Sequence, residues 1–234
     1  MQDISKTTPL QSDSAALIDT VVATFRSGMS EQNRQHAQNS FQFAALAAGG
    51  EYSRKDQREE WFDRVIEILG VTGWTVQQRT YEKETASTTT LTVGSVALRV
   101  FGAVGRAALG GPIGDALGAL AQQAFDGLKT MTDDVEVFLA RNKDSLKGLT
   151  GIVGCVEVDG SLHMVISALD TKAPDNQFDV LGINVHLESS EYYKGTAWLT
   201  FNKDTSADVR DHITRELGDH ALKSVLSIKL PKRA

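Results

Sequence analysis

Apolar side chains in the first third of the chain recur three or four positions apart, which is the spacing of one face of an α-helix. Ser30 and Ser53 are of a residue type that caps helix starts, and glycines close each of the three apolar stretches. The clearest stripe runs from Trp61 to Leu69. After a disordered lead over residues 1–12, this pattern predicts three helices over residues 13–28, 30–50 and 53–70.

Farther along, the pattern changes to that of strands. Asp159-Gly160 lies between two apolar runs, and this dipeptide is the strongest short-range signal for a β-hairpin. In residues 181–187 and 193–201 apolar and polar side chains alternate, which is typical of a strand with one wet face. The remaining predicted elements are an extended segment over residues 74–81 and helices over residues 132–139 and 204–227.

Helices grouped before and after a block of strands are typical of an α+β fold. We therefore expect an antiparallel sheet of about four to five strands that packs against helices, with a central hairpin of two helices over residues 91–131. A length of 234 residues fits one domain, which we place over residues 13–234.

The predicted helical hairpin is rich in glycine and alanine and almost uncharged. The charged side chains of residues 91–125 are Arg99, Arg106 and Asp115. A helix that is apolar all round has to be buried in protein or in lipid, and Gly110-Gly111-Pro112 provides the turn between two such helices. Two alternatives stay open: the hairpin is core, or it inserts into a membrane as in helical pore-forming proteins. The candidate side chains for membrane insertion are Val100, Phe101, Val104, Leu109, Ile113 and Leu117.

The glycines of this segment favour the buried alternative. Gly110, Gly114 and Gly118 are four residues apart, a spacing that lets two helix backbones approach closely. Each arm is also too charged or too short for a conventional membrane span. Because glycine is unfavourable inside a helix, so many glycines indicate close packing or a helix that rearranges.

The Asp159-Gly160 turn also places the single cysteine. A two-residue turn pairs Cys155 with Met164, and cross-strand partners point to the same face of a sheet. We expect Cys155 to face the core, and His163 to lie on an opposite, wetter face. The side chains expected beside Cys155, as the lining of an apolar cavity, are Val153, Leu162, Met164 and Ile166. If the hairpin covers this face, Cys155 and the hairpin form a single site.

The composition limits which partners and which cellular compartment we expect for the chain. A net charge of −6 argues against extensive phosphate contacts, so we expect no nucleic acid as partner. One cysteine allows no intramolecular disulfide, which fits a reducing compartment. The first residues contain no apolar signal-peptide core. We expect a protein that is cytoplasmic as synthesised, with non-classical release or membrane association left open.

The sequence gives little support for a catalytic site. Apolar surroundings raise the pKa of a thiol, which argues against Cys155 as a nucleophile, and no nucleophile–base pair is visible. His212 and His220 flank Glu216 on one helix face, but groups eight residues apart lie about 12 Å from each other and cannot share one ion. We expect no catalytic residue and no metal site, and the sequence leans toward a protein that is not an enzyme.

Four features together carry a resemblance: the segment from Trp61 to Leu69, Gly73-Trp74, the Gly/Ala-rich helical pair, and Gly154-Cys155 in a strand. Over about half of the chain, this set resembles small bacterial proteins, mostly uncharacterised, and distantly resembles the Evf-type bacterial virulence factors. The resemblance implies an intracellular α/β protein that is needed for persistence in an insect gut. It also implies a palmitoyl thioester on a cysteine in an apolar cavity, and Cys155 is the position that can take this role.

Two functional hypotheses follow. In the first, the chain is a virulence-factor-like protein that contacts a lipid surface, a membrane or a host protein, is S-acylated at Cys155, and forms pores through the hairpin. In the second, it is a non-enzymatic interaction or assembly module whose hairpin is buried core. Neither hypothesis specifies an oligomeric state.

Overall fold

The computed structural model describes residues 13–18, 21–53, 56–85, 92–129, 149–171, 191–202 and 207–227. Along the chain its elements are β1 (Ser14–Ile18), β2 (Val21–Phe25), α1 (Glu31–Glu51), α2 (Arg58–Val71), β3 (Trp74–Thr85), α3 (Val93–Leu109), α4 (Gly111–Lys129), β4 (Leu149–Val158), β5 (Ser161–Thr171), β6 (Glu191–Phe201) and α6 (Ala207–Ser227). The predicted lead over residues 1–12, the helix over 132–139 and the strand over 181–187 lie outside the described residues.

The described strands form one open sheet in the order β1-β2-β4-β5-β6-β3. Four of its neighbouring pairs are antiparallel, and β2 and β4 are parallel. The α+β class is confirmed. The sheet differs from the prediction in having six strands and one parallel pair.

Both differences begin with residues 13–28, where the predicted helix is wrong. This segment forms the antiparallel pair β1 and β2. All five residues of β2, from Val21 to Phe25, are buried. A strand covered on both faces reads as a continuous apolar run, which periodicity alone does not separate from a buried helix. The β-branched side chains of Val21, Val22 and Thr24 favour the strand.

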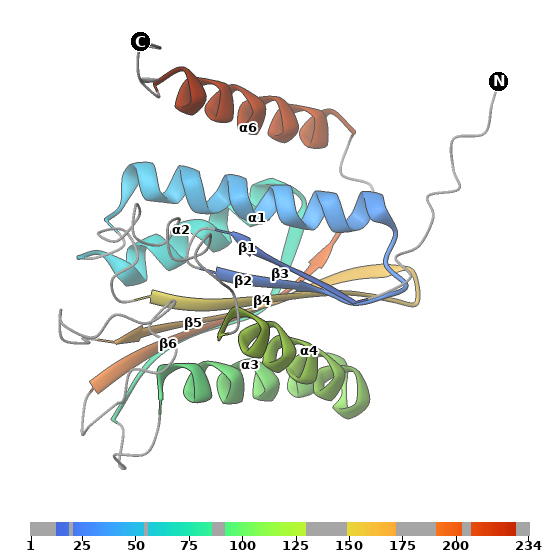
Figure 1. Cartoon of the computed structure of the whole chain (residues 1–234), viewed down its shortest axis with the longest axis vertical. Coiled ribbons are helices and arrows are strands. Elements are labelled where there is room, and N and C mark those ends of the chain that lie inside the picture. The colour runs from blue at the N-terminus through green and yellow to red at the C-terminus, as the bar shows by residue number, and fades with distance from the viewer. Residues whose placement is uncertain are drawn as a thin grey trace, which may run out of the picture.

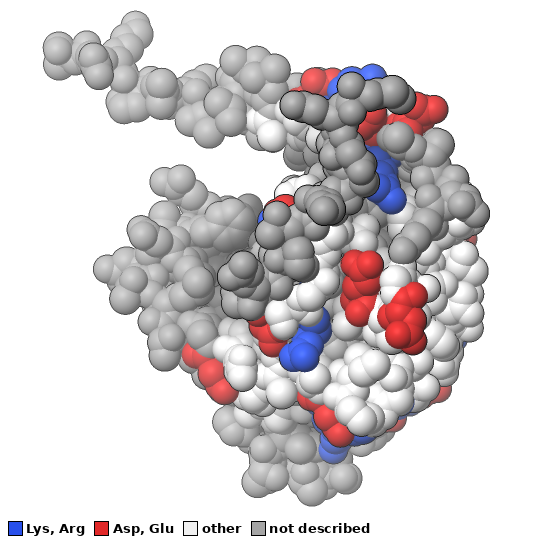
Figure 2. Space-filling model, turned by 90° about the vertical axis from the view of Figure 1, so that its right-hand side faces the viewer, with Lys and Arg blue, Asp and Glu red and all other residues white. Residues whose placement is uncertain are grey.

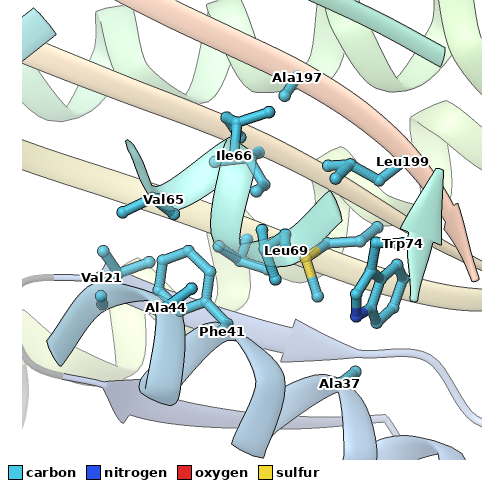
Figure 3. Packing of buried hydrophobic residues seen from close by; sticks show 14 of the residues in the cluster. Val21, Ala37, Phe41, Ala44, Val65, Ile66, Leu69, Trp74, Ala197 and Leu199 are labelled. Atoms are coloured by element: carbon cyan, nitrogen blue, oxygen red, sulfur yellow. The ribbon is translucent and has the colours of Figure 1, made fainter. Parts of the chain in front are cut away.

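Helices cover both faces of the sheet (Figure 1). α1 and α2 lie on one face and α3 and α4 on the other, while α6 lies outside α1, farthest from the sheet. Figure 3 shows the first core, in which Phe41 of α1 and Leu69 of α2 pack toward the sheet. The second core lies under α3 and α4 and includes Phe101 and Leu117. The hairpin is therefore an outer layer and not the central element that we expected.

Local chemistry sets several of the element boundaries. Ser30 caps α1, accepting a hydrogen bond from the backbone N–H of Asn33 at 3.1 Å. Thr92 and Ser95 form a reciprocal capping box at the start of α3. Gly110 ends α3 with a φ of +82°. Ser53 accepts a bond from the N–H of Asp56 at 3.2 Å, yet α2 begins a turn later, at Arg58.

Candidate functional site

The sulfur of Cys155 lies in the core between the sheet and α1 and α2. Cys155 pairs with Met164 of β5 and, on its other side, with Phe25 of β2, so the register predicted from the turn is confirmed. Asp159 and Gly160 at that turn have φ values of 47° and 72°, as a two-residue hairpin requires. The predicted neighbours in the same core are Val153, Leu162, Met164 and Ile166, each at most 3% exposed.

These surroundings suppress thiol chemistry. Cys155 is 0% exposed, and burial raises the pKa of its thiol far above the usual range. A thiolate is the nucleophilic form of cysteine, and here it is strongly disfavoured. The residue behaves as a small apolar side chain in the described structure. Its proposed role as an acyl attachment point stays a prediction.

The hairpin and Cys155 lie on opposite faces of the sheet, so the idea of a single site is wrong. Gly154, the residue before Cys155, faces the hairpin: a Cβ atom there would come within 2.4 Å of Cζ of Phe101. Successive residues of a strand point to opposite faces. The face with His163 is therefore the one that α3 and α4 cover, and Ser167 on it is 1% exposed. Near the Asp159-Gly160 turn, Ser161 is exposed and His163 partly exposed, so the wetter face that we expected is present only at that end.

The six candidate insertion residues divide into two groups. Phe101 and Leu117 are fully buried against the sheet. The other four are only partly buried, and these are Val100, Val104, Leu109 and Ile113. Leu109 and Ile113 flank the turn of the hairpin, whose glycines and Pro112 are exposed, while Val100 and Val104 lie farther back along α3.

Glycine brings the two arms of the hairpin together. A Cβ atom on Gly114 would lie 2.3 Å from the backbone nitrogen of Arg106, and one on Gly118 would lie 3.7 Å from Cα of Gly102. Arg106 and Asp115 pair across the arms at 3.1 Å, on the exposed side. The small-residue spacing thus serves close helix packing. Among the described helices, none combines the length and the apolarity that crossing a membrane requires.

A polar cleft of about 510 Å³ lies between α1 and α6. Its lining includes Glu31, His36 and Asn39 from α1 and Arg210, Asp211 and Thr214 from α6. Sequence reasoning missed this cleft because its two walls lie at opposite ends of the chain. The available signal was His36 itself, an ionisable side chain placed on the apolar side of a Gln/Asn-rich helix.

The histidines of α6 form no larger cluster in the described structure. His212 Nδ1 and Glu216 Oε1 are 4.0 Å apart, and both side chains are about half exposed. Among the described residues, no three His, Cys, Asp or Glu side chains come together in a way that could hold a metal ion.

No protein-family model and no curated protein matches the chain. Among solved structures, it is similar to a delta-endotoxin at 13% identity with a TM-score of 0.42, covering 89% of this chain and 92% of that one. It is also similar to the structure of the Evf virulence factor at 11% identity with a TM-score of 0.32, covering 81% and 74% of the two chains. Distant structural neighbours thus include a toxin and a virulence factor. No function or site residue is carried over from either.

Proposed function

We propose that this is a membrane-interacting protein of the virulence-factor type, and that the turn of the α3–α4 hairpin is the part that contacts lipid. One observation carries the proposal: the hairpin is an outer layer, and the partly exposed apolar side chains of Leu109 and Ile113 flank its uncharged turn. An amphipathic element of this kind suits the interface of a membrane rather than a full span.

The surface around the turn has little charge. The hairpin turns at the right-hand end of Figure 1, which faces the viewer in Figure 2, and the lower part of that face is mostly free of Lys, Arg, Asp and Glu. Arg106 and Asp115 lie beside the turn, but they pair with each other and leave no net charge. Lipid contact at the turn would therefore remove water from one ion pair at most, and this pair has no net charge.

The apolar side chains give the expected strength of binding. Full burial of a Leu or Ile side chain contributes about 1.5–3 kcal/mol. Leu109 and Ile113 are partly buried already, with about a third of each side chain exposed at most, so lipid contact by the pair contributes about 1–2 kcal/mol. This predicts weak, reversible association with vesicles.

Vesicle co-sedimentation tests the proposal with one matched pair of variants. Ile113→Asp places a charge at the turn and should lower the partition coefficient roughly tenfold or more. Val71→Asp makes the same change at an apolar residue that is 79% exposed at the end of α2, and it should leave binding unchanged. Equal losses in both variants, or no binding of the wild type to any vesicle, would contradict the proposal.

Pore formation is a finer part of this proposal and needs its own variant. Gly102→Cys with Gly118→Cys is the pair to test for joining the two arms, because the helices approach closely here: a Cβ on Gly118 would lie 3.7 Å from Cα of Gly102. If pores need the arms to separate, the oxidised variant binds vesicles but releases no trapped dye until it is reduced. Leakage that is unchanged by oxidation would exclude separation of the arms. Full burial keeps Cys155 out of this disulfide.

Palmitoylation of Cys155 is supported only by the apolar side chains around its sulfur. A palmitoyl chain on Cys155 has to occupy space between the sheet and the helices α1 and α2. In this structure these helices pack directly against the sheet. Intact mass of the natively expressed chain tests it: an added palmitoyl mass that hydroxylamine removes, and that Cys155→Ser lacks, is the supporting result. An unmodified mass from the native host rejects it.

A different form of this proposal has the same apolar turn contact a protein instead of lipid; unlike the interaction or assembly module predicted from the sequence, it does not need the hairpin to be buried core. A self-association that Ile113→Asp abolishes and Val71→Asp leaves intact would favour it. Light scattering of the wild type and both variants, without vesicles, separates the two functions.

A further inference from the structure

The side chain of His36, on α1, packs against one end of the sheet. It is 5% exposed. Its ring stacks on Trp74 of β3, with centroids 6.1 Å apart and planes 3° from parallel, and lies 4.3 Å from the ring of Phe201 on β6. Its Nε2 is 3.4 Å from Oγ of Ser40, one turn along α1. The imidazole is therefore packed as an aromatic side chain.

α6 covers the contact between His36 and Phe201 from the solvent side, and few of its own side chains are buried. Among its residues from 208 to 221, Ile213 is buried and the others are partly or fully exposed. The Arg210 guanidinium lies 5.1 Å from the centre of the Phe201 ring, on which His36 also packs. Arg210 Nε is buried and has no hydrogen-bond partner. Figure 1 shows α6 as the outermost helix, next to α1.

The charges around His36 disfavour a second cation there. Burial, and after it the positive charge of Arg210, lower the pKa of His36 to about 4. Glu31 of α1 and Asp211 of α6 line the same cleft, and Glu31 is paired with Arg34. From β3 and β6 the groups that meet the ring are the Trp74 indole and the Phe201 phenyl, which do not titrate.

We propose that His36 is an acid-sensitive switch that releases α6 from α1. Protonation places an imidazolium inside an apolar contact beside the Arg210 guanidinium. Detachment of α6 returns Arg210 to water and opens the cleft side of His36 to solvent. The released state exposes the face of Phe201 that Arg210 covers and the former contact of Ile213. This inference is independent of the hairpin and its lipid contact.

Proton linkage gives the size of the effect. The closed state binds a proton on His36 with a pKa of about 4. In the open state the ring keeps Trp74 and Phe201 beside it, so its pKa rises toward the ordinary value of 6.5, which is the upper limit. The closed state is therefore favoured near pH 7 and loses this advantage as the pH falls through the open-state pKa. Between pH 7 and pH 5 the opening equilibrium constant increases by at most on the order of 20-fold.

Native-state hydrogen exchange measures this ratio even when the open state is rare. Most of the stability of a protein helix comes from packing of its apolar face, so the amides of α6 exchange when it leaves α1. After correction for the intrinsic exchange rate, protection of the α6 amides should fall measurably from pH 7 to pH 5, by up to about 20-fold. The β5 amides, in the centre of the sheet, should keep their protection, which shows that the opening is local.

Three variants identify the residue responsible. In His36→Gln the pH dependence of α6 protection should disappear. It should also disappear in His36→Phe, which keeps an aromatic ring in the stack. His212→Gln is the matched control: it removes a histidine that is about half exposed on α6 itself and should keep the full response. A wild-type α6 whose protection does not change down to pH 5 overturns the proposal. So does a folded His36 variant in which protection falls as much as in the wild type.

Discussion

A substitution at Gly154 tests how closely the α3–α4 hairpin packs on the sheet. A Cβ atom at this position would lie 2.4 Å from Cζ of Phe101, whose side chain is fully buried. Non-bonded carbon atoms pack about 3.5–4.0 Å apart. Gly154→Ala therefore forces the Phe101 ring, and the helix that carries it, to move by about 1 Å.

The net cost follows from two opposing terms. Overpacking of a buried contact costs about 1–3 kcal/mol. Replacement of glycine also restricts the unfolded chain and recovers about 0.4–1 kcal/mol. We expect Gly154→Ala to lower the free energy of unfolding by about 1–2 kcal/mol, and Tm by about 2–8 °C for a chain of this size.

Urea unfolding followed by circular dichroism provides the assay, with Gly70→Ala as the control. A Cβ on Gly70, in α2, would meet nothing within 4 Å, so the same substitution should stabilise the protein there by up to about 1 kcal/mol. Phe101→Leu makes room at the contact, and the cost of the double variant should be smaller than the sum of the single costs.

Two results would refute the reasoning. If Gly154→Ala is as harmless as Gly70→Ala, the ring does not lie against this strand. If the costs of the Gly154 and Phe101 changes simply add, the two residues do not touch, and the hairpin does not cover this face.

Three further predictions concern single residues. Gly114→Ala should destabilise the protein by about 2 kcal/mol or more in urea unfolding, because its Cβ would lie 2.3 Å from backbone, whereas Gly118→Ala at 3.7 Å should be tolerated. Thr92→Ala removes the capping box of α3 and should cost about 1 kcal/mol, measured in the same way. The thiol of unmodified Cys155 should not react with Ellman's reagent in the native state and should react fully in denaturant, because it is buried and its pKa is raised. Rapid native reaction would contradict the described core.

Short-range signals predicted much of the fold correctly. The Ser30 cap, the Gly110 turn and the Asp159-Gly160 turn each depend on a few neighbouring residues, and each is present in the structure. The two-residue turn also determined the register, and with it the burial of Cys155. Such signals are readable from sequence because backbone conformation and local hydrogen bonds decide them.

The tertiary structure alone decided which elements meet. The alternation in β4 distinguishes the face of Cys155 from the face of Gly154, but both faces are apolar, and nothing in the pattern says which pair of helices covers each. The buried run in β2 fits a helix or a strand until β4 pairs with it. His36 and Arg210 become neighbours only when α6 packs on α1. Burial and long-range contact depend on the whole chain, because apolar surface can be satisfied by any partner of suitable shape.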